Sequence, residues 1–256
     1  MLLVIDVGNT NTVLGLYDGE TLAKRWRLET SPSRTSDEYA VLLQQLFAMG
    51  DVDRGSVDGC ILSCVVPPMQ TRFVQMVEAA FGIAPLVIGP GIRTGMPILY
   101  ENPREVGADR IVNAVAAFER CGSACIVVDF GTATTFDAIS SRGEYLGGAI
   151  VPGVTISADA LFSRASRLPR VEIARPARVI GRNTVASMQA GIVYGYASLV
   201  DGMVERIIDE YGEPMQVIAT GGLAPLFADA ATRIEAFDAD LTLDGLRLMY
   251  LRNQRS

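Results

Sequence analysis

The stretch DVGNTNT at residues 6–12 recurs as DFGTATT at residues 129–135. Both copies follow the pattern D-x-G-x-x-x-T, and they lie nearly half a chain apart in a sequence of 256 residues. Each copy comes directly after a short apolar run and precedes a strand that turns at a Gly-Glu pair, Gly19-Glu20 in the first copy and Gly143-Glu144 in the second. This agreement on both sides predicts a duplicated strand-turn-strand unit and two similar α/β halves.

Hydrophobic periodicity predicts the remaining elements. We expect strands at residues 2–5, 13–17, 22–28, 59–66, 85–90, 125–128 and 215–219, and helices at 35–47, 70–81, 109–120, 184–211 and from about 225. Thr35 and Glu38 have the spacing of a capping box at a helix start. Gly191, Gly195 and Gly202 lie in the longest helix, where we expect them to permit close packing.

The chemistry of the two turns suits phosphate. Glycine lets the backbone approach an anion, successive amides supply donors, and threonine or asparagine side chains add more. A carboxylate beside a phosphate requires a cation between them. Asp6 and Asp129 are therefore predicted to face a metal-bound polyphosphate from opposite sides of a cleft. The alternative is that both are ordinary Asx turns at strand ends.

A third element, Thr220-Gly221-Gly222, follows an apolar strand and leads into a helix. Bare backbone there suits a flat ring or a ribose, and the alternative is a tight strand-helix connection. The sequence contains neither a Walker A motif nor G-x-G-x-x-G, which disfavours P-loop and Rossmann nucleotide sites.

Composition narrows the function further. There is no histidine, so a Ser-His-Asp triad, an HExxH zinc site and an imidazole proton shuttle are excluded. The formal net charge of -7 argues against nucleic-acid binding. Four cysteines at 60, 64, 121 and 125 are expected to be free thiols in a reducing cytosol. No signal-peptide pattern or membrane-length apolar run is visible, so we expect a cytoplasmic protein with no membrane partner.

Longer stretches resemble the type III pantothenate kinase family. They are both turns together with residues 102–110 (NPREVGADR), 113–115, 147–153, 182–184 and 240–246. The resemblance implies the actin-like ATPase fold of the acetate and sugar kinase, Hsp70 and actin superfamily, with two duplicated ribonuclease-H-like α/β domains and the active site in the cleft between them. The implied N-terminal domain spans 1–120 with the first phosphate turn. The implied C-terminal domain spans 121–256 with the second phosphate turn and the adenosine turn.

The resemblance also implies a reaction. The γ-phosphoryl group of ATP would pass to the 4′-hydroxyl of pantothenate, the first step of coenzyme A synthesis. The implied cofactors are magnesium-bound ATP and a monovalent cation, K⁺ or NH₄⁺. The implied assembly is a homodimer.

Asp109 is the candidate general base. In a chain without histidine a carboxylate is the natural proton acceptor for an alcohol, and Asp109 begins a helix after the open stretch Gly107-Ala108. Its alternative is a plain N-cap residue. Arg110 could hold the substrate carboxylate through its planar fork, and its alternative is a solvated helix charge.

The resemblance distributes the other roles. ATP would contact Asp6, Val7, Gly8, Asn9, Thr10, Asn11, Thr12, Val13, Thr132, Gly221 and Gly222, with Asp129 on the monovalent cation. Pantothenate would contact Tyr100, Gly107, Ala108, Asp109, Arg110 and Thr184. Tyr100 could otherwise be a loop residue, and Thr184 could simply cap its helix.

Two other functions remain open from the sequence. One is a phosphotransferase or phosphatase of the same superfamily that acts on a sugar or polyphosphate. The other is a non-catalytic nucleotide-binding regulator or filament protein.

Overall fold

The computed structural model describes residues 1–254, which form two compact units. Unit 1 contains residues 1–95, residues 101–116 and the segment from 242 onward. Unit 2 contains residues 96–100 and 117–241. The expected domain boundary at residue 120 stays a prediction. Within these units, the segment from 242 onward packs with the N-terminal residues.

Unit 1 is built on a five-stranded sheet of order β3-β2-β1-β4-β5. The strands are β1 (Leu2–Val7), β2 (Asn11–Asp18), β3 (Thr21–Glu29), β4 (Gly59–Cys64) and β5 (Leu86–Val87). β1, β2 and β3 form an antiparallel meander, whereas β4 and β5 continue the sheet in parallel. β1 is therefore the central strand, with neighbours on both sides.

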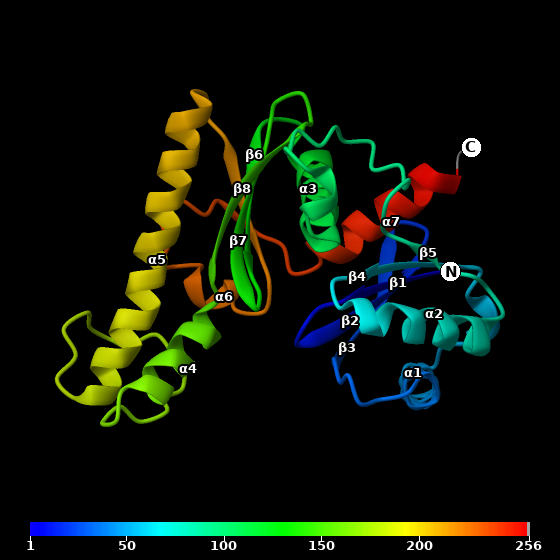
Figure 1. The fold of residues 1–256 in the computed structure, drawn as a ribbon, viewed down its shortest axis with the longest axis horizontal. Helices are drawn as coiled ribbons and strands as arrows, with labels where there is room; N and C mark the ends of the chain where they lie inside the picture. The colour runs from blue at the N-terminus through cyan, green and yellow to red at the C-terminus, as the bar shows by residue number, and fades with distance from the viewer. Residues whose placement is uncertain (255–256) are drawn as a thin grey trace. The chain divides into compact units, whose positions relative to one another are not determined.

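Helices cover both faces of this sheet. α1 (Ser36–Met49) and α2 (Pro67–Phe81) lie together on one side (Figure 1) and bury the alternate residues Leu3, Ile5 and Val7 of β1. α7 (Leu241–Gln254) covers the other face, where its Leu243 lies against Gly15. α3 (Ala108–Cys121) begins in unit 1 and packs against α7, with the Val112 carbonyl beside Gly245. The short helices are η1 (Arg54–Ser56) and η2 (Pro103–Glu105).

Unit 2 repeats the same topology, with the strand order β10-β9-β6-β7-β8. Its elements are β6 (Cys125–Phe130), β7 (Ala133–Ile139), β8 (Tyr145–Pro152), α4 (Val154–Arg164), α5 (Thr184–Tyr211), β9 (Gln216–Thr220), α6 (Ala224–Phe227) and β10 (Ala236–Phe237). β6, β7 and β8 are antiparallel neighbours, and β9 and β10 extend the sheet in parallel. α5 runs along one face of this sheet (Figure 1) and packs Val193, Val200 and Val204 into its core. The predicted duplication is confirmed.

The two turns are not equivalent residue for residue. Val7 pairs with Thr12 in the first copy, whereas Phe130 pairs with Thr134 in the second. The second turn is thus one residue shorter, and the counterpart of Thr12 is Thr134. The motif alignment, which matched Thr12 to Thr135, is wrong by one position because it aligned letters rather than strand register.

Most expected elements are present, with three differences. Pro67 and Pro68 open α2 instead of only ending the strand before it, as proline does well in a first helical turn. α4 and α7 were not anticipated as helices. Gly191 and Gly195 do not serve close packing within this chain, since a Cβ on either would meet no atom within 4 Å.

Other expectations hold in the described part of the chain. The capping box of Thr35 and Glu38 is formed, and α5 has the predicted bounds. All four cysteines are free. Among residues 1–254, no helix combines the length and apolar character needed to cross a bilayer.

Candidate active site

Asp6 lies near the end of β1, on the sheet face opposite α1 and α2, because its neighbours Ile5 and Val7 point to those helices. Its register partners are Val13 on β2 and Ser63 on β4. The Asp6 Oδ1 atom is buried and has no hydrogen-bond partner. A buried carboxylate oxygen without a donor is costly, and it is the kind of atom that a bound cation satisfies.

Burial, together with the nearby charge of Asp109, raises the pKa of Asp6 to about 7, and Ser63 opposes the rise. Asp6 and Asp109 are thus brought close enough for their charges to interact within unit 1. Two carboxylates that repel each other in a buried setting favour a cation or a proton between them. That these residues share an active site stays a prediction.

The first phosphate turn is held by its own backbone. The Gly8 N–H donates to the Asn11 carbonyl at 3.0 Å, and the Thr30 N–H donates to the Thr10 carbonyl at 3.0 Å. A Cβ at Gly8 would lie 3.0 Å from that Asn11 oxygen, so glycine permits the tight turn. The side chains of residues 9–11 are exposed. The turn is therefore rigid in its backbone and presents polar side chains to solvent, as a phosphate site requires.

Asp109 is the second residue of α3, not its N-cap, so the plain capping alternative is wrong as stated. Its Oδ1 accepts a hydrogen bond from the Arg110 N–H at 2.8 Å. A Cβ at Gly107 would lie only 2.5 Å from the same oxygen, which is why a glycine precedes it. Burial raises the pKa of Asp109, and the Arg110 backbone and charge oppose the rise. A raised pKa makes a carboxylate a better proton acceptor near neutral pH.

Arg110 is 8% exposed, so the alternative of a solvated helix charge is wrong. Its charge lies close enough to Asp109 to oppose the rise in the pKa of that carboxyl.

In unit 2, Asp129 occupies the place on β6 that Asp6 occupies on β1, with Thr135 and Thr220 as register partners. Gly221 has φ +95°, and a Cβ on it would lie 2.5 Å from Asp129 Oδ1. The Gly221-Gly222 turn therefore brings bare backbone against the Asp129 carboxylate. The sequence indicated the Asp129 turn and the Gly221-Gly222 turn separately, but it did not indicate that the two lie against each other.

The second phosphate turn is also close-packed. The Gly131 N–H donates to the Ala133 carbonyl at 3.1 Å. A Cβ at Gly153 would lie 2.1 Å from the Thr132 carbonyl oxygen, so the turn abuts the residue that caps α4. The side chain of Thr132 is exposed.

Tyr100 lies in a loop that is attached to β8. The Leu99 N–H donates to the Tyr145 carbonyl and the Tyr145 N–H donates to the Pro97 carbonyl, each at 2.8 Å, which fastens the 97–99 segment to β8. The Tyr100 ring lies 6.4 Å from that of Tyr145, centroid to centroid. Tyr145 in turn donates its hydroxyl to the buried Asp137 carboxylate at 2.7 Å. Asp137 and Tyr145 are supports that sequence reasoning missed.

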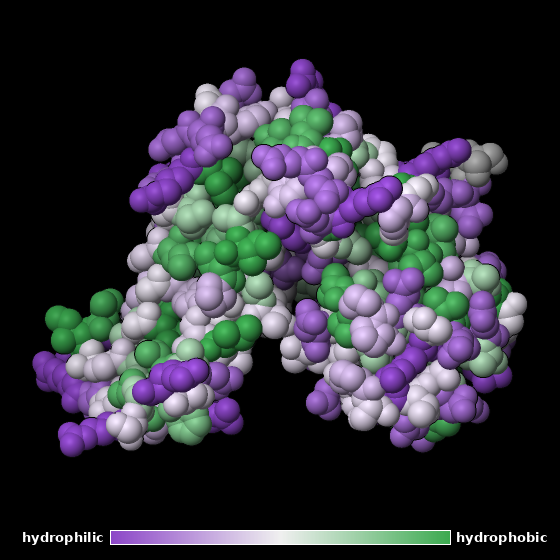
Figure 2. Space-filling model, viewed as in Figure 1, coloured by the Kyte–Doolittle hydropathy of each residue, from purple (hydrophilic) through white to green (hydrophobic). Residues whose placement is uncertain are grey.

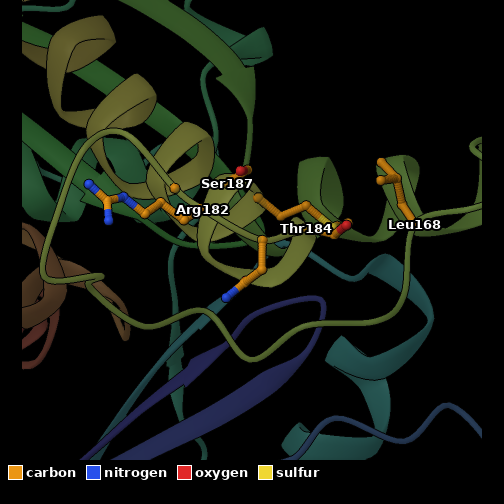
Figure 3. A pocket seen from close by; sticks show the side chains of 7 residues that line it. Leu168, Arg182, Thr184 and Ser187 are labelled. Carbon is orange, nitrogen blue, oxygen red and sulfur yellow. The ribbon is translucent and has the colours of Figure 1, made fainter.

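Thr184 is the first residue of α5, and the cap is Asn183, whose side chain accepts from the Ala186 N–H at 2.8 Å. The alternative of a capping role for Thr184 is therefore wrong. Thr184 lines a shallow hollow of about 530 Å³ with Gly181, Arg182, Ser187 and others (Figure 3). Figure 3 shows these side chains around the first turn of α5, the segment that precedes it and Leu168.

The Asp6 carboxylate is the group in unit 1 that suits a magnesium ion carried by a nucleotide. Among residues 1–254, no three acidic or cysteine side chains are grouped to hold an ion. Magnesium is commonly bound through one or two carboxylates together with substrate phosphates. The unpartnered Oδ1 of Asp6 beside the first turn matches that arrangement.

Solved structures show the fold class of this chain. One is the inorganic polyphosphate/ATP-glucomannokinase of Arthrobacter sp. strain KM, with a TM-score of 0.54 at 16% identity over 98% of each chain. Another is the activator of 2-hydroxyisocaproyl-CoA dehydratase from Clostridium difficile, with a TM-score of 0.56 at 12% identity over 100% of this chain and 97% of that one. The chain thus has the duplicated ribonuclease-H-like fold of the sugar kinases and actin-like ATPases.

Sequence comparison then gives the family. The sequence model of the type III pantothenate kinase family matches residues 2–206. A curated type III pantothenate kinase of Myxococcus xanthus strain DK1622 is 59% identical over 256 residues, which is all of both chains. This chain belongs to the type III pantothenate kinase family.

The buried Asp6 generates a stability prediction. Its pKa of about 7 lies above the ordinary value of 3.8, so the ionised form destabilises the ligand-free fold progressively as pH rises from about 4 through 7. The variant Asp6→Asn removes that charge. We expect it to exceed the wild type in free energy of unfolding at pH 8 by on the order of 2–4 kcal/mol, and to match it near pH 4.

Urea unfolding of the ligand-free protein at both pH values measures the difference. Asp18→Asn, which removes an exposed carboxylate at the end of β2, is the matched control and should change stability little at either pH. Equal stability of Asp6→Asn and wild type at pH 8 would contradict the assignment of a costly buried charge.

Proposed function

We propose that this chain transfers the γ-phosphoryl group of ATP to the 4′-hydroxyl of pantothenate. The observation that carries the proposal is the pairing of Asp6 and Asp109, two half-buried carboxylates whose charges interact beside a glycine turn. Asp6 is suited to face a metal-bound phosphate, and Asp109 is suited to accept the proton of a hydroxyl group. Family membership supplies the acceptor, because the relatives are named for pantothenate.

The first turn holds the phosphates in this proposal. Its backbone is fixed by the Gly8 and Thr30 hydrogen bonds, and the amides of residues 9–11 are proposed to meet the anion, since the Gly8 N–H is already used within the turn. Asp6 faces the magnesium or its water ligands and is ionised when the cation is bound. Magnesium, when bound, neutralises charge on the β- and γ-phosphates.

Asp109 is the general base. As the acceptor oxygen forms its bond to the γ-phosphorus, the hydroxyl proton passes to the Asp109 carboxylate and the bond from the γ-phosphorus to the bridging oxygen breaks. ADP leaves with that oxygen, and Asp109 later releases the proton to water. The hydrogen bond from the Arg110 N–H fixes the Oδ1 atom at 2.8 Å. The Asp109 side chain is therefore oriented before substrate binds.

The remaining contacts follow the family assignment. Arg110 holds the pantothenate carboxylate, and Tyr100, Gly107, Ala108 and Thr184 line the rest of the acceptor site. The fastening of residues 97–99 to β8 supports a positioned role for Tyr100. The adenosine lies on the Gly221-Gly222 turn, Thr132 contacts a phosphate, and Asp129 contacts a monovalent cation, K⁺ or NH₄⁺.

The protein is further proposed to act as a homodimer in the cytoplasm. Small residues of α5 line an open groove with Tyr194, and the glycines among them, Gly191 and Gly195, face empty space. Val179 and Ile180 nearby are 66% and 82% exposed. Figure 2 shows hydrophobic residues gathered over the segment that joins α4 to α5. Free cysteines are typical of a reducing compartment.

An assay of ADP release with ATP, magnesium and pantothenate tests the activity. We expect turnover that requires potassium or ammonium, and little turnover when sugars replace pantothenate. Absence of turnover with pantothenate in potassium would contradict the proposal. Turnover with a sugar alone would move the chain to another phosphotransferase of the same fold.

The variant Asp129→Ala tests, in the same assay, the assignment of Asp129 to the monovalent cation. We expect weaker ATP binding and a blunted potassium response, because a carboxylate is lost where the cation lies. Asp159→Ala, which removes a half-exposed carboxylate on α4 of the same unit that pairs with Arg170, is the control. An unchanged potassium titration for Asp129→Ala would refute the assignment.

Removal of the base gives a separate prediction. Asp109→Asn is expected to retain ATP binding and to lose about 10²–10⁴-fold in turnover, the usual contribution of a general base. Glu101→Gln, an exposed acidic residue just upstream, should keep turnover close to that of the wild type. A loss of tenfold or less in Asp109→Asn would reduce Asp109 to a structural residue.

A further inference from the structure

Ser63 is a polar residue in an otherwise apolar strand. It belongs to β4, where Cys60, Ile61 and Leu62 precede it, and all four side chains are buried. The Ser63 Oγ atom makes no hydrogen bond of normal geometry in the ligand-free structure. A buried hydroxyl without a partner costs free energy of folding, so its presence calls for a compensating role.

The parallel register of β1 and β4 places Ser63 directly beside Asp6. Leu62 packs into the core under α1 and α2, so Ser63 points to the opposite face of the sheet, as Asp6 does. Ser63 also opposes the rise in the pKa of Asp6, which reflects a hydroxyl close to the carboxylate. Two buried polar atoms that lack partners, Ser63 Oγ and Asp6 Oδ1, thus lie next to each other.

Neighbouring groups do not replace this hydroxyl. The Cys64 thiol donates to the Val66 carbonyl at 3.2 Å and is engaged there. Asp109 is an acceptor when ionised and repels Asp6. Ser63 is therefore a donor suited to turn the Asp6 carboxylate.

We propose that Ser63 is a positioning residue of the active site, whose hydroxyl donates a hydrogen bond to the Asp6 carboxylate and fixes its orientation toward metal-bound nucleotide. The inference rests on the proposed function, because that function assigns Asp6 to the magnesium side of ATP. It extends the assignment of Asp6 by naming the residue that orients its carboxylate. Groups that orient a metal-facing carboxylate through a hydrogen bond strongly affect metal affinity.

The second half of the chain offers an internal parallel. Thr220 on β9 stands beside Asp129 in the same register as Ser63 beside Asp6, and it too is buried. A hydroxyl next to the motif aspartate is thus present in both sheets. This parallel predicts that threonine can take the place of Ser63.

Binding of Mg·ADP by isothermal titration calorimetry, in buffer with potassium, tests the proposal without relying on turnover. We expect Ser63→Ala to weaken binding by about 10–100-fold. Ser63→Thr should bind close to wild type because it keeps the hydroxyl. In an Asp6→Asn background, Ser63→Ala should cause little further loss, since the group that it orients is already gone.

Cys60→Ala is the matched structural control. Cys60 lies on the same strand but faces the α1 and α2 core, so its truncation should lower stability and leave Mg·ADP affinity unchanged. Wild-type affinity in Ser63→Ala, or an equal loss with and without Asp6, would overturn the role of Ser63 alone. Failure of the wild type to bind Mg·ADP would contradict the proposed function as well.

Discussion

The carboxylate of Asp6 is the constraint around which unit 1 is arranged. β1 is central in its sheet, so a residue near its end is flanked by β2 and β4 and is partly withdrawn from water. Burial and the nearby Asp109 raise the pKa of Asp6 to about 7. A site that keeps such a charge is suited to a cation-bound anion, which repays the cost that the ligand-free fold bears. The glycine turn and the start of α3 supply the two sides that such a ligand needs.

Unit 2 repeats the scaffold but uses it differently. Asp129 has the same register place as Asp6, yet the Gly221 backbone lies against its carboxylate. The second turn is also one residue shorter, as the pairing of Phe130 with Thr134 shows. The duplicated fold therefore keeps its strand order while the two turns diverge, which agrees with different tasks for the two aspartates.

Features set by local sequence were predicted well. The duplicated turns, the capping box at Thr35 and the long α5 helix follow from glycine, aspartate and apolar spacing along the chain. Asp109 was proposed as the base because the absence of histidine left a carboxylate as the natural candidate, and that role stays a prediction. Its place as second residue of α3 could not be predicted, because helix bounds inferred from sequence are uncertain by several residues.

Features set by register or packing were missed. Ser63 and Asp137 look like isolated polar residues in apolar strands until the neighbouring strand is known. Whether Gly191 and Gly195 face the sheet or point away from it depends on which face of α5 packs on the sheet. The sequence does not settle this, because apolar residues at similar spacing surround both glycines. The signal that could have found Ser63 is a hydroxyl residue near the end of a buried strand, matched by Thr220 in the second half.

A crystal structure with magnesium and a non-hydrolysable ATP analogue tests the central claim most directly. The account predicts phosphate oxygens at hydrogen-bond distance, about 3 Å, from backbone amides of residues 9–11, with the magnesium or its waters against the Asp6 carboxylate. Nucleotide phosphates bound elsewhere, for example in the hollow at the start of α5, with Asp6 free of metal and water ligands, would contradict it.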